Sequence, residues 1–200
     1  MERLGAAGRA AGREIPCSRL REGTRIAFTT RYPTSYRRVV ESPAGGRRMT
    51  PREFLDQVVR QNVADFHANY GSLRHGYNAV AVVDALAAHI FWYIRNAPAQ
   101  GDDTAYRATL ASRNHDFRLL RDIAKAQKHV RLTKGVPQVV RAEQVSARPI
   151  GYGEGQYGAG RYGGPPQLVV DINPGDFRYV ESVVDAALTF LEGEMQRLGI

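Results

Sequence analysis

The stretch RNHDFRLLRDIAKAQKHVRL, residues 113–132, holds the side chains of this chain best suited to acid–base chemistry. At 100° per residue on a helix, its ionisable side chains gather on one side and apolar ones fill the opposite arc. The ionisable residues that share this side are His115, Arg118, Arg121, Asp122, Lys125, Lys128 and His129. Side chains at the edge of an apolar face are partly desolvated, which shifts pKa values and restricts motion. The pattern therefore predicts a candidate site on a helix.

Two interpretations of this helix remain open. Imidazole has a reference pKa of about 6.5, so His129 is suited to proton transfer close to neutral pH. In the alternative, the same residues are a solvated surface in which Asp122 forms exposed ion pairs worth about 0.3–0.5 kcal/mol each. His129 would then be stabilised by the partial negative charge at the C-terminal end of its helix. On spacing alone, the solvated surface with ion pairs is the more common outcome.

A mainly helical domain with a polar-flanked arginine and a histidine near the end of a long helix resembles the HEPN superfamily. The resemblance covers about residues 50–134 and rests on Arg121-Asp122 followed by His129. The interval between arginine and histidine is slightly longer here than the family's usual spacing. Lys128-His129 near a helix end, followed by a hairpin, also looks like a group of uncharacterised bacterial proteins. The resemblance implies a small helical bundle, often a homodimer, that acts as a metal-independent endoribonuclease without a cofactor.

The resemblance also implies roles for individual side chains. His129 would act as the base or acid when the 2′-hydroxyl of RNA attacks its own phosphate. Arg121 would stabilise the charge that builds on the phosphorane, and Asp122 would orient the imidazole. A second chain in a dimer would supply a further histidine. The substrate-binding candidates are Arg118, Lys125 and His115. A non-enzymatic module that binds another protein is the alternative function.

The elements that must position these residues are mostly helices. Periodic apolar residues predict helices at about 51–70, 77–96, 103–112, 114–133 and 181–198. Thr50, Pro51 and Glu53 form a capping box before the first, and Asn114 caps the fourth. Strands are predicted at 137–147, 167–172 and 177–180, with a tight turn at 173–176. We expect a mainly α bundle of four to five helices, with a small antiparallel sheet inserted at 136–180 before the C-terminal helix.

The net charge of +8 is concentrated at the start of the chain. Residues 1–48 carry +7, whereas residues 49–200 are almost neutral at +1, so overall charge says little about a partner of the folded part. The first 48 residues show no sustained periodicity and predict a disordered basic tail. Because Met49 stands directly before the capping box, a second interpretation is a start assigned too far upstream. Residues 49–200 are expected to form a single domain.

A glycine–tyrosine repeat lies between the predicted strands. GYGEGQYGAGRYGG places Tyr152, Tyr157 and Tyr162 in register at a period of five. Its G-x-G-x-x-G match lacks the helix that a dinucleotide site requires, so that function is excluded. Tyrosines interleaved with an arginine could stack on unpaired bases. A flexible loop without such a role is the favoured alternative.

Other features exclude several function classes. Cys17 is the only cysteine and the histidines lack metal-binding spacings, so we expect no metal and no intrachain disulfide. The apolar run at 78–94 contains Asp84 and His89 and is short for a bilayer, so it predicts a buried helix and no membrane partner. Both polar residues are expected to be satisfied core groups. With no apolar signal segment and an arginine content typical of a GC-rich genome, we expect a cytoplasmic protein.

Overall fold

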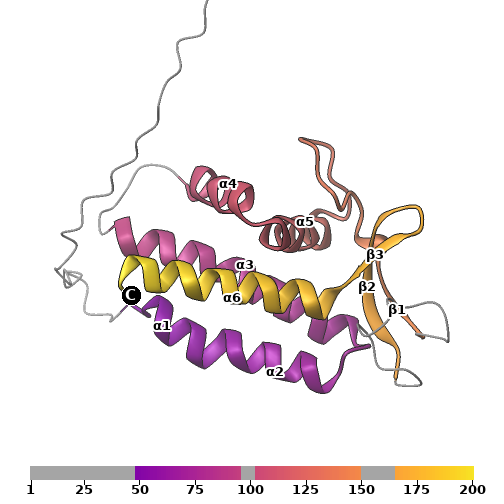
Figure 1. The fold of residues 1–200 in the computed structure, drawn as a ribbon, viewed down its shortest axis with the longest axis horizontal. Coiled ribbons are helices and arrows are strands. Elements are labelled where there is room, and N and C mark those ends of the chain that lie inside the picture. Colours follow the sequence, from indigo (N-terminus) through magenta and orange to yellow (C-terminus); the bar gives the residue numbers. More distant parts are fainter. Residues whose placement is uncertain (1–47, 96–101, 150–164) are drawn as a thin grey trace, which may run out of the picture. The chain divides into compact units, whose positions relative to one another are not determined.

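The chain divides into two units, Met1–Arg37 and Arg38–Ile200. A computed structural model describes residues 48–95, 102–149 and 165–200, all within the second unit. That unit is mainly helical, with a small antiparallel sheet before the C-terminal helix (Figure 1). The predicted fold class is therefore confirmed.

The first helical segment runs from residue 51 to residue 68 and contains a wider turn near its start. It consists of α1 (Pro51–Phe54), the π-helical turn η1 (Leu55–Val59) and α2 (Arg60–Ala68). The predicted capping box is confirmed, because the Thr50 hydroxyl accepts from the Glu53 amide at 3.1 Å and the Thr50 amide donates to the Glu53 carboxylate at 2.9 Å. The expected end at residue 70 is two residues late.

Helix α3 (Leu73–Arg95) begins four residues before the predicted start at residue 77. It is long and apolar enough to cross a membrane by length and composition alone. In the structure one face of α3 packs into the core instead, against α2, α5 and α6 (Figure 1). Its fully buried side chains include Val80, Val83, Leu86 and Ile90. This packing accounts for the apolar composition of the helix.

The remaining helices are α4 (Thr104–Arg113), α5 (His115–His129) and α6 (Val180–Leu198). The boundaries of α4 and α6 lie within one residue of those predicted. The predicted end of the fourth helix at residue 133 is wrong, since α5 stops at His129. Val130 adopts a φ of +62°, and the Arg131 amide donates to the His129 carbonyl at 2.6 Å. Gly135, two residues after the predicted end, lies in the returning loop.

The sheet contains β1 (Val145–Arg148), β2 (Gln167–Asn173) and β3 (Asp176–Tyr179), antiparallel and in that order. The predicted strand at 137–147 is wrong over most of its length. Residues 142–144 form the 3-10 turn η2, and only an isolated bridge between Arg131 and Arg141 precedes it. The Gln144 side chain stabilises this non-strand path by accepting from the Val140 and Arg141 amides, at 2.6 and 2.9 Å.

The core joins the helices to one face of the sheet. Leu168 and Val170 of β2 belong to the same cluster of buried apolar side chains as the helix interiors. The turn before α3 approaches β2 closely, because the Leu168 amide donates to the Tyr70 carbonyl at 3.0 Å. The largest fully buried side chains of this cluster include Phe66, Phe117, Leu86, Ile90, Leu120, Ile123 and Leu191. The sheet and α5 are thus held by one packed interior.

Candidate functional site

Helix α5 positions all the ionisable residues singled out in the sequence. Asn114 starts it, accepting from the Phe117 amide at 2.7 Å, as the sequence predicts. The apolar side of the helix is buried against α3 and α6. The buried residues on that side are Phe117, Leu119, Leu120, Ile123 and Ala126. The orientation of the polar side follows from this burial, since both sides belong to one rigid helix.

Three of the predicted site residues contact the loop that returns from the end of α5. Asp122, only 7% exposed, accepts from the Gln138 amide at 2.9 Å. The His115 ring nitrogen Nε2 lies 2.9 Å from the Gln138 side-chain nitrogen, and Arg118 donates to the Val136 carbonyl at 3.0 Å. These contacts give the three side chains an architectural role. Burial raises the pKa of the Asp122 carboxyl, which the Gln138 amide partly offsets.

Arg121 and Lys125 face a different neighbourhood, formed by α3 and α4. Asp84 of α3 pairs with Arg107 of α4, and Arg107 also contacts Asp103 at 3.2 Å. Burial and the positive charge of Arg107 lower the pKa of the half-buried Arg121 guanidinium. Burial and the charge of Arg121 likewise lower the pKa of Lys125. Three cations and the acids Asp84 and Asp103 therefore act on one another across three helices.

Several polar atoms in this cluster are buried without a hydrogen-bond partner among the described residues. They are Nε of Arg107, Nε of Arg121 and Oδ1 of Asp84. A buried donor without an acceptor costs about 1–3 kcal/mol. Burial also raises the pKa of Asp84. The Arg121 guanidinium is thus partly desolvated, and a nearby anion would stabilise its charge.

His129 lies apart from this cluster. It is exposed and is the last residue of α5. Eight residues separate it from Arg121, which corresponds to about 12 Å along the axis and roughly 80° around it. The imidazole and the guanidinium therefore do not leave the helix at one point, and Lys125 lies between them on the helix surface. The contacts of Asp122 go to Gln138 instead of to this imidazole.

The other polar residues considered as candidates in the sequence make packing or ion-pair contacts. The ring of His89 stacks on Phe54 with centroids 3.8 Å apart, and burial lowers its pKa. Asp84 has its ion pair with Arg107. Tyr152, Tyr157 and Tyr162 lie outside the described residues. Asp84 and His89 are half-buried, and Oδ1 of Asp84 has no hydrogen-bond partner among the described residues, so the prediction of satisfied core groups holds only in part. The tyrosine repeat stays a prediction.

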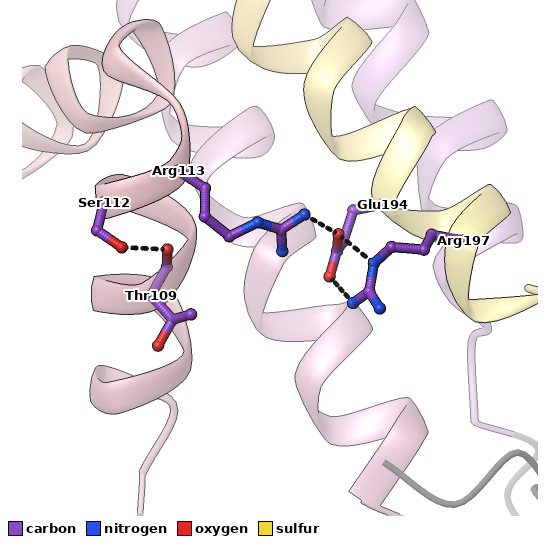
Figure 2. Close-up of polar contacts among 5 residues, drawn as sticks. All are labelled: Thr109, Ser112, Arg113, Glu194 and Arg197. Atoms are coloured by element: carbon purple, nitrogen blue, oxygen red, sulfur yellow. Dashed lines mark hydrogen bonds and ion pairs between the residues drawn. The ribbon is translucent and has the colours of Figure 1, made fainter. Parts of the chain in front are cut away.

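Two polar clusters were not predicted from the sequence. In the first, Arg107 pairs with both Asp84 and Asp103, and an aspartate in an apolar helix does predict some cationic partner. Nothing in the spacing indicates which arginine fills that role. Figure 2 shows the second cluster, in which Arg113 of α4 and Arg197 of α6 converge on Glu194. The Glu194 side chain is 1% exposed, so the cluster ties the two helices together.

Two surface hollows are lined by residues outside α5. The larger hollow, of about 460 Å³, is open and lies beside the turn between β2 and β3. It is lined by Gln144, Arg148, Asp171, Ile172, Asn173, Pro174 and Gly175. The candidate site is therefore the open side of α5 together with the cations packed beside it.

Comparison with protein-family models, curated proteins and solved structures gave no match for this chain. The resemblance to the HEPN superfamily accordingly stays a prediction.

Proposed function

We propose that this domain binds RNA along the cationic side of α5 and cleaves it by a metal-independent acid–base reaction. One observation carries the proposal. Within the described parts of the chain, Arg121, Lys125 and Lys128 form no ion pair, although all are on one side of the helix. The local charge of this side is thus positive even though residues 49–200 as a whole are almost neutral.

The burial of Arg121 makes an anionic ligand a better partner than bulk water. Because its pKa is lowered by burial and by Arg107, the charged guanidinium is held at a cost in free energy. An oxyanion beside the guanidinium would reduce that cost. The cations are spread along the helix, so a ligand with successive phosphates suits them better than a single small anion.

The proposed reaction uses the 2′-hydroxyl of the RNA as nucleophile. His129 accepts the hydroxyl proton while the 2′-oxygen bonds to phosphorus, and the 5′-oxygen leaves and takes up a proton. Lys125, one helical turn from His129, stabilises the additional negative charge on the phosphorane, and Arg121, two turns away, binds a neighbouring phosphate of the same strand. His129 is exposed, so RNA laid along α5 can reach it. A second copy of the chain would supply the acid that protonates the leaving oxygen, consistent with a homodimer.

The test separates binding from cleavage. We expect Arg121→Ala and Lys125→Ala each to weaken binding of labelled single-stranded RNA by about tenfold or more, measured by fluorescence anisotropy in the full-length chain. His129→Ala should retain binding and abolish cleavage in a gel assay. EDTA should leave cleavage unchanged. Lys134→Ala and His75→Gln remove a cation and an imidazole elsewhere, and should behave as the unaltered chain does.

A specific observation favours the second candidate function, a module that binds another protein. Trp92 and Tyr93, at the end of α3, are 40% and 42% exposed. Large exposed aromatic side chains are common in protein interfaces. RNA binding that is equal in the unaltered chain, Arg121→Ala and Lys125→Ala would reject the RNA proposal and leave this alternative.

A further inference from the structure

His67, Glu181 and Asp185 bring three metal-ligating side chains together although more than a hundred residues separate the first from the others. One ligand atom from each residue lies within 4.8 Å of the other two. Nε2 of His67 lies 3.0 Å from Oδ1 of Asp185. All three side chains are half-buried, so they are held in place yet open to solvent.

The fold fixes this arrangement with two packed helices. His67 is in the last turn of α2, and Glu181 is in the first turn of α6. Asp185 follows Glu181 by four residues, which places both carboxylates on the same face of α6. Helices α2 and α6 contact each other directly. The ligand atoms thus come from rigid elements and not from a loop.

We propose that these three residues bind a divalent first-row transition ion, with Zn²⁺ the best fit. One imidazole nitrogen and two carboxylates match Zn²⁺, whereas Mg²⁺ and Ca²⁺ take oxygen ligands almost exclusively. Atoms bonded to zinc at about 2.0–2.2 Å lie roughly 3.3–3.6 Å from one another in a tetrahedral site. The His67–Asp185 distance of 3.0 Å is slightly shorter than this, and the three ligand atoms lie within 4.8 Å of one another, so small shifts would bring them around one ion.

Glu181 and Asp185 place two carboxylates on one face of α6, and like charges at i and i+4 repel each other. A dication bound between them would remove this repulsion. Since α2 and α6 each supply ligands, the ion would stabilise the packing of these helices. It would act separately from the cations of α5, so this site does not depend on the proposed function.

The experiment uses the full chain, purified metal-free, with Cys17→Ser in every version to remove the only thiol. We expect saturating Zn²⁺ to raise the midpoint of thermal unfolding by about 5–10 °C, and Mg²⁺ to leave it unchanged. Substituting Co²⁺ should give the visible absorption bands of a nitrogen- and oxygen-bound ion. EDTA should reverse the thermal shift without changing any RNA cleavage.

His67→Gln and Asp185→Asn preserve side-chain size and should lose both the thermal shift and the Co²⁺ absorption, with unaltered helical circular dichroism. The matched control is His75→Gln, which should keep both signals. Loss in the two site variants alone supports the proposal. A shift that persists in them, or the absence of a shift and of Co²⁺ absorption in the unaltered chain, overturns it whatever the result with RNA.

Discussion

At the scale of single residues, Glu194 shows how a buried carboxylate is kept ionised. Burial alone would raise its pKa, but hydrogen bonds from Arg197 and Arg113 outweigh that effect and hold the pKa below the usual 4.5. The bonds are 2.9 and 2.5 Å to Arg197 and 3.0 Å to Arg113 (Figure 2). The Arg113 guanidinium also lies 5.6 Å from the centre of the Phe190 ring. Glu194 is therefore a stabilising link between α4 and α6.

Replacing this carboxylate should cost stability in a pH-dependent way. We expect Glu194→Gln to reduce the free energy of unfolding by about 1–3 kcal/mol at pH 7, because charge-assisted hydrogen bonds are lost. A lowered folded-state pKa gives stability that is present above the unfolded value of 4.5 and is lost as the pH falls through the folded value. The difference between the two chains should accordingly shrink below about pH 4.5, as measured by urea unfolding.

Glu192→Gln is the matched control, two residues away on the same helix. Its carboxylate is 32% exposed and contacts Arg60 at 2.9 Å, so its loss should cost less than about 1 kcal/mol. Equal costs at both positions, or a cost at Glu194 that does not change with pH, would contradict the role assigned to the buried link.

The residues of the candidate site were only partly predictable from the sequence. Wheel geometry correctly placed His115, Arg118 and Asp122 on the polar side of a helix, because periodicity is a local property. It could not reveal that all three contact residues 136–138, since the path of that loop depends on where α5 ends. The surroundings of Arg121 could not be predicted either, because Asp84 and Arg107 approach it from two other helices.

At the scale of elements, the sequence predicts helices better than their ends and better than the sheet. The capping box at Thr50 and the cap at Asn114 are confirmed, since each involves neighbours in the chain. The wide turn η1 and the early start of α3 have no such local signal. Residues 137–144 have strand-like composition, yet the side chain of Gln144 holds them in another path. A local contact between a side chain and the backbone three and four residues earlier overrides strand propensity there.

The close approach between the α2–α3 turn and the sheet gives a test at this scale. A β-carbon on Gly71 would lie 2.4 Å from the Pro166 carbonyl oxygen, which is backbone and cannot rotate away. We expect Gly71→Ala to lower the free energy of unfolding by about 1–3 kcal/mol, because β2 must move away from the turn. Chemical denaturation followed by circular dichroism would measure this loss.

Gly193→Ala provides the matched control for that substitution. Gly193 lies within α6, and a β-carbon there would have no neighbour within 4 Å among the described residues. Alanine should raise stability by up to about 1 kcal/mol through its higher helix propensity. If both alanine variants are equally stable, the turn is not packed against β2 as tightly as the structure indicates.

At the scale of the whole molecule, charge and packing are unevenly distributed along the chain. Residues 1–48 carry +7 of the net charge of +8, whereas the described members of the core cluster begin at Leu55. The first described helix starts with its own capping box at Thr50. The first described helix therefore has a cap formed by residues next to it in the chain.

Deleting residues 1–48 should leave the folded domain intact. We expect the chain 49–200 to have the same free energy of unfolding as the full chain within about 0.5 kcal/mol. Urea unfolding followed by circular dichroism would compare the two. A chain that begins at residue 60 should be much less stable, because it lacks the capping box and the buried Leu55 and Val59. A large loss already in 49–200 would show that the first segment contributes to the fold.

The backbone of Val130 has a consequence for everything that follows α5. A β-branched residue at a φ of +62° is unfavourable, by about 1–3 kcal/mol, and such a conformation persists only where its surroundings enforce it. The enforcing contacts are the hydrogen bonds of Arg118 to Val136 and of Asp122 to Gln138, six and eight residues after Val130. Weakening those hydrogen bonds would allow Val130 to return to a negative φ. The last turn of α5 could then extend, which would change the orientation of the His129 imidazole.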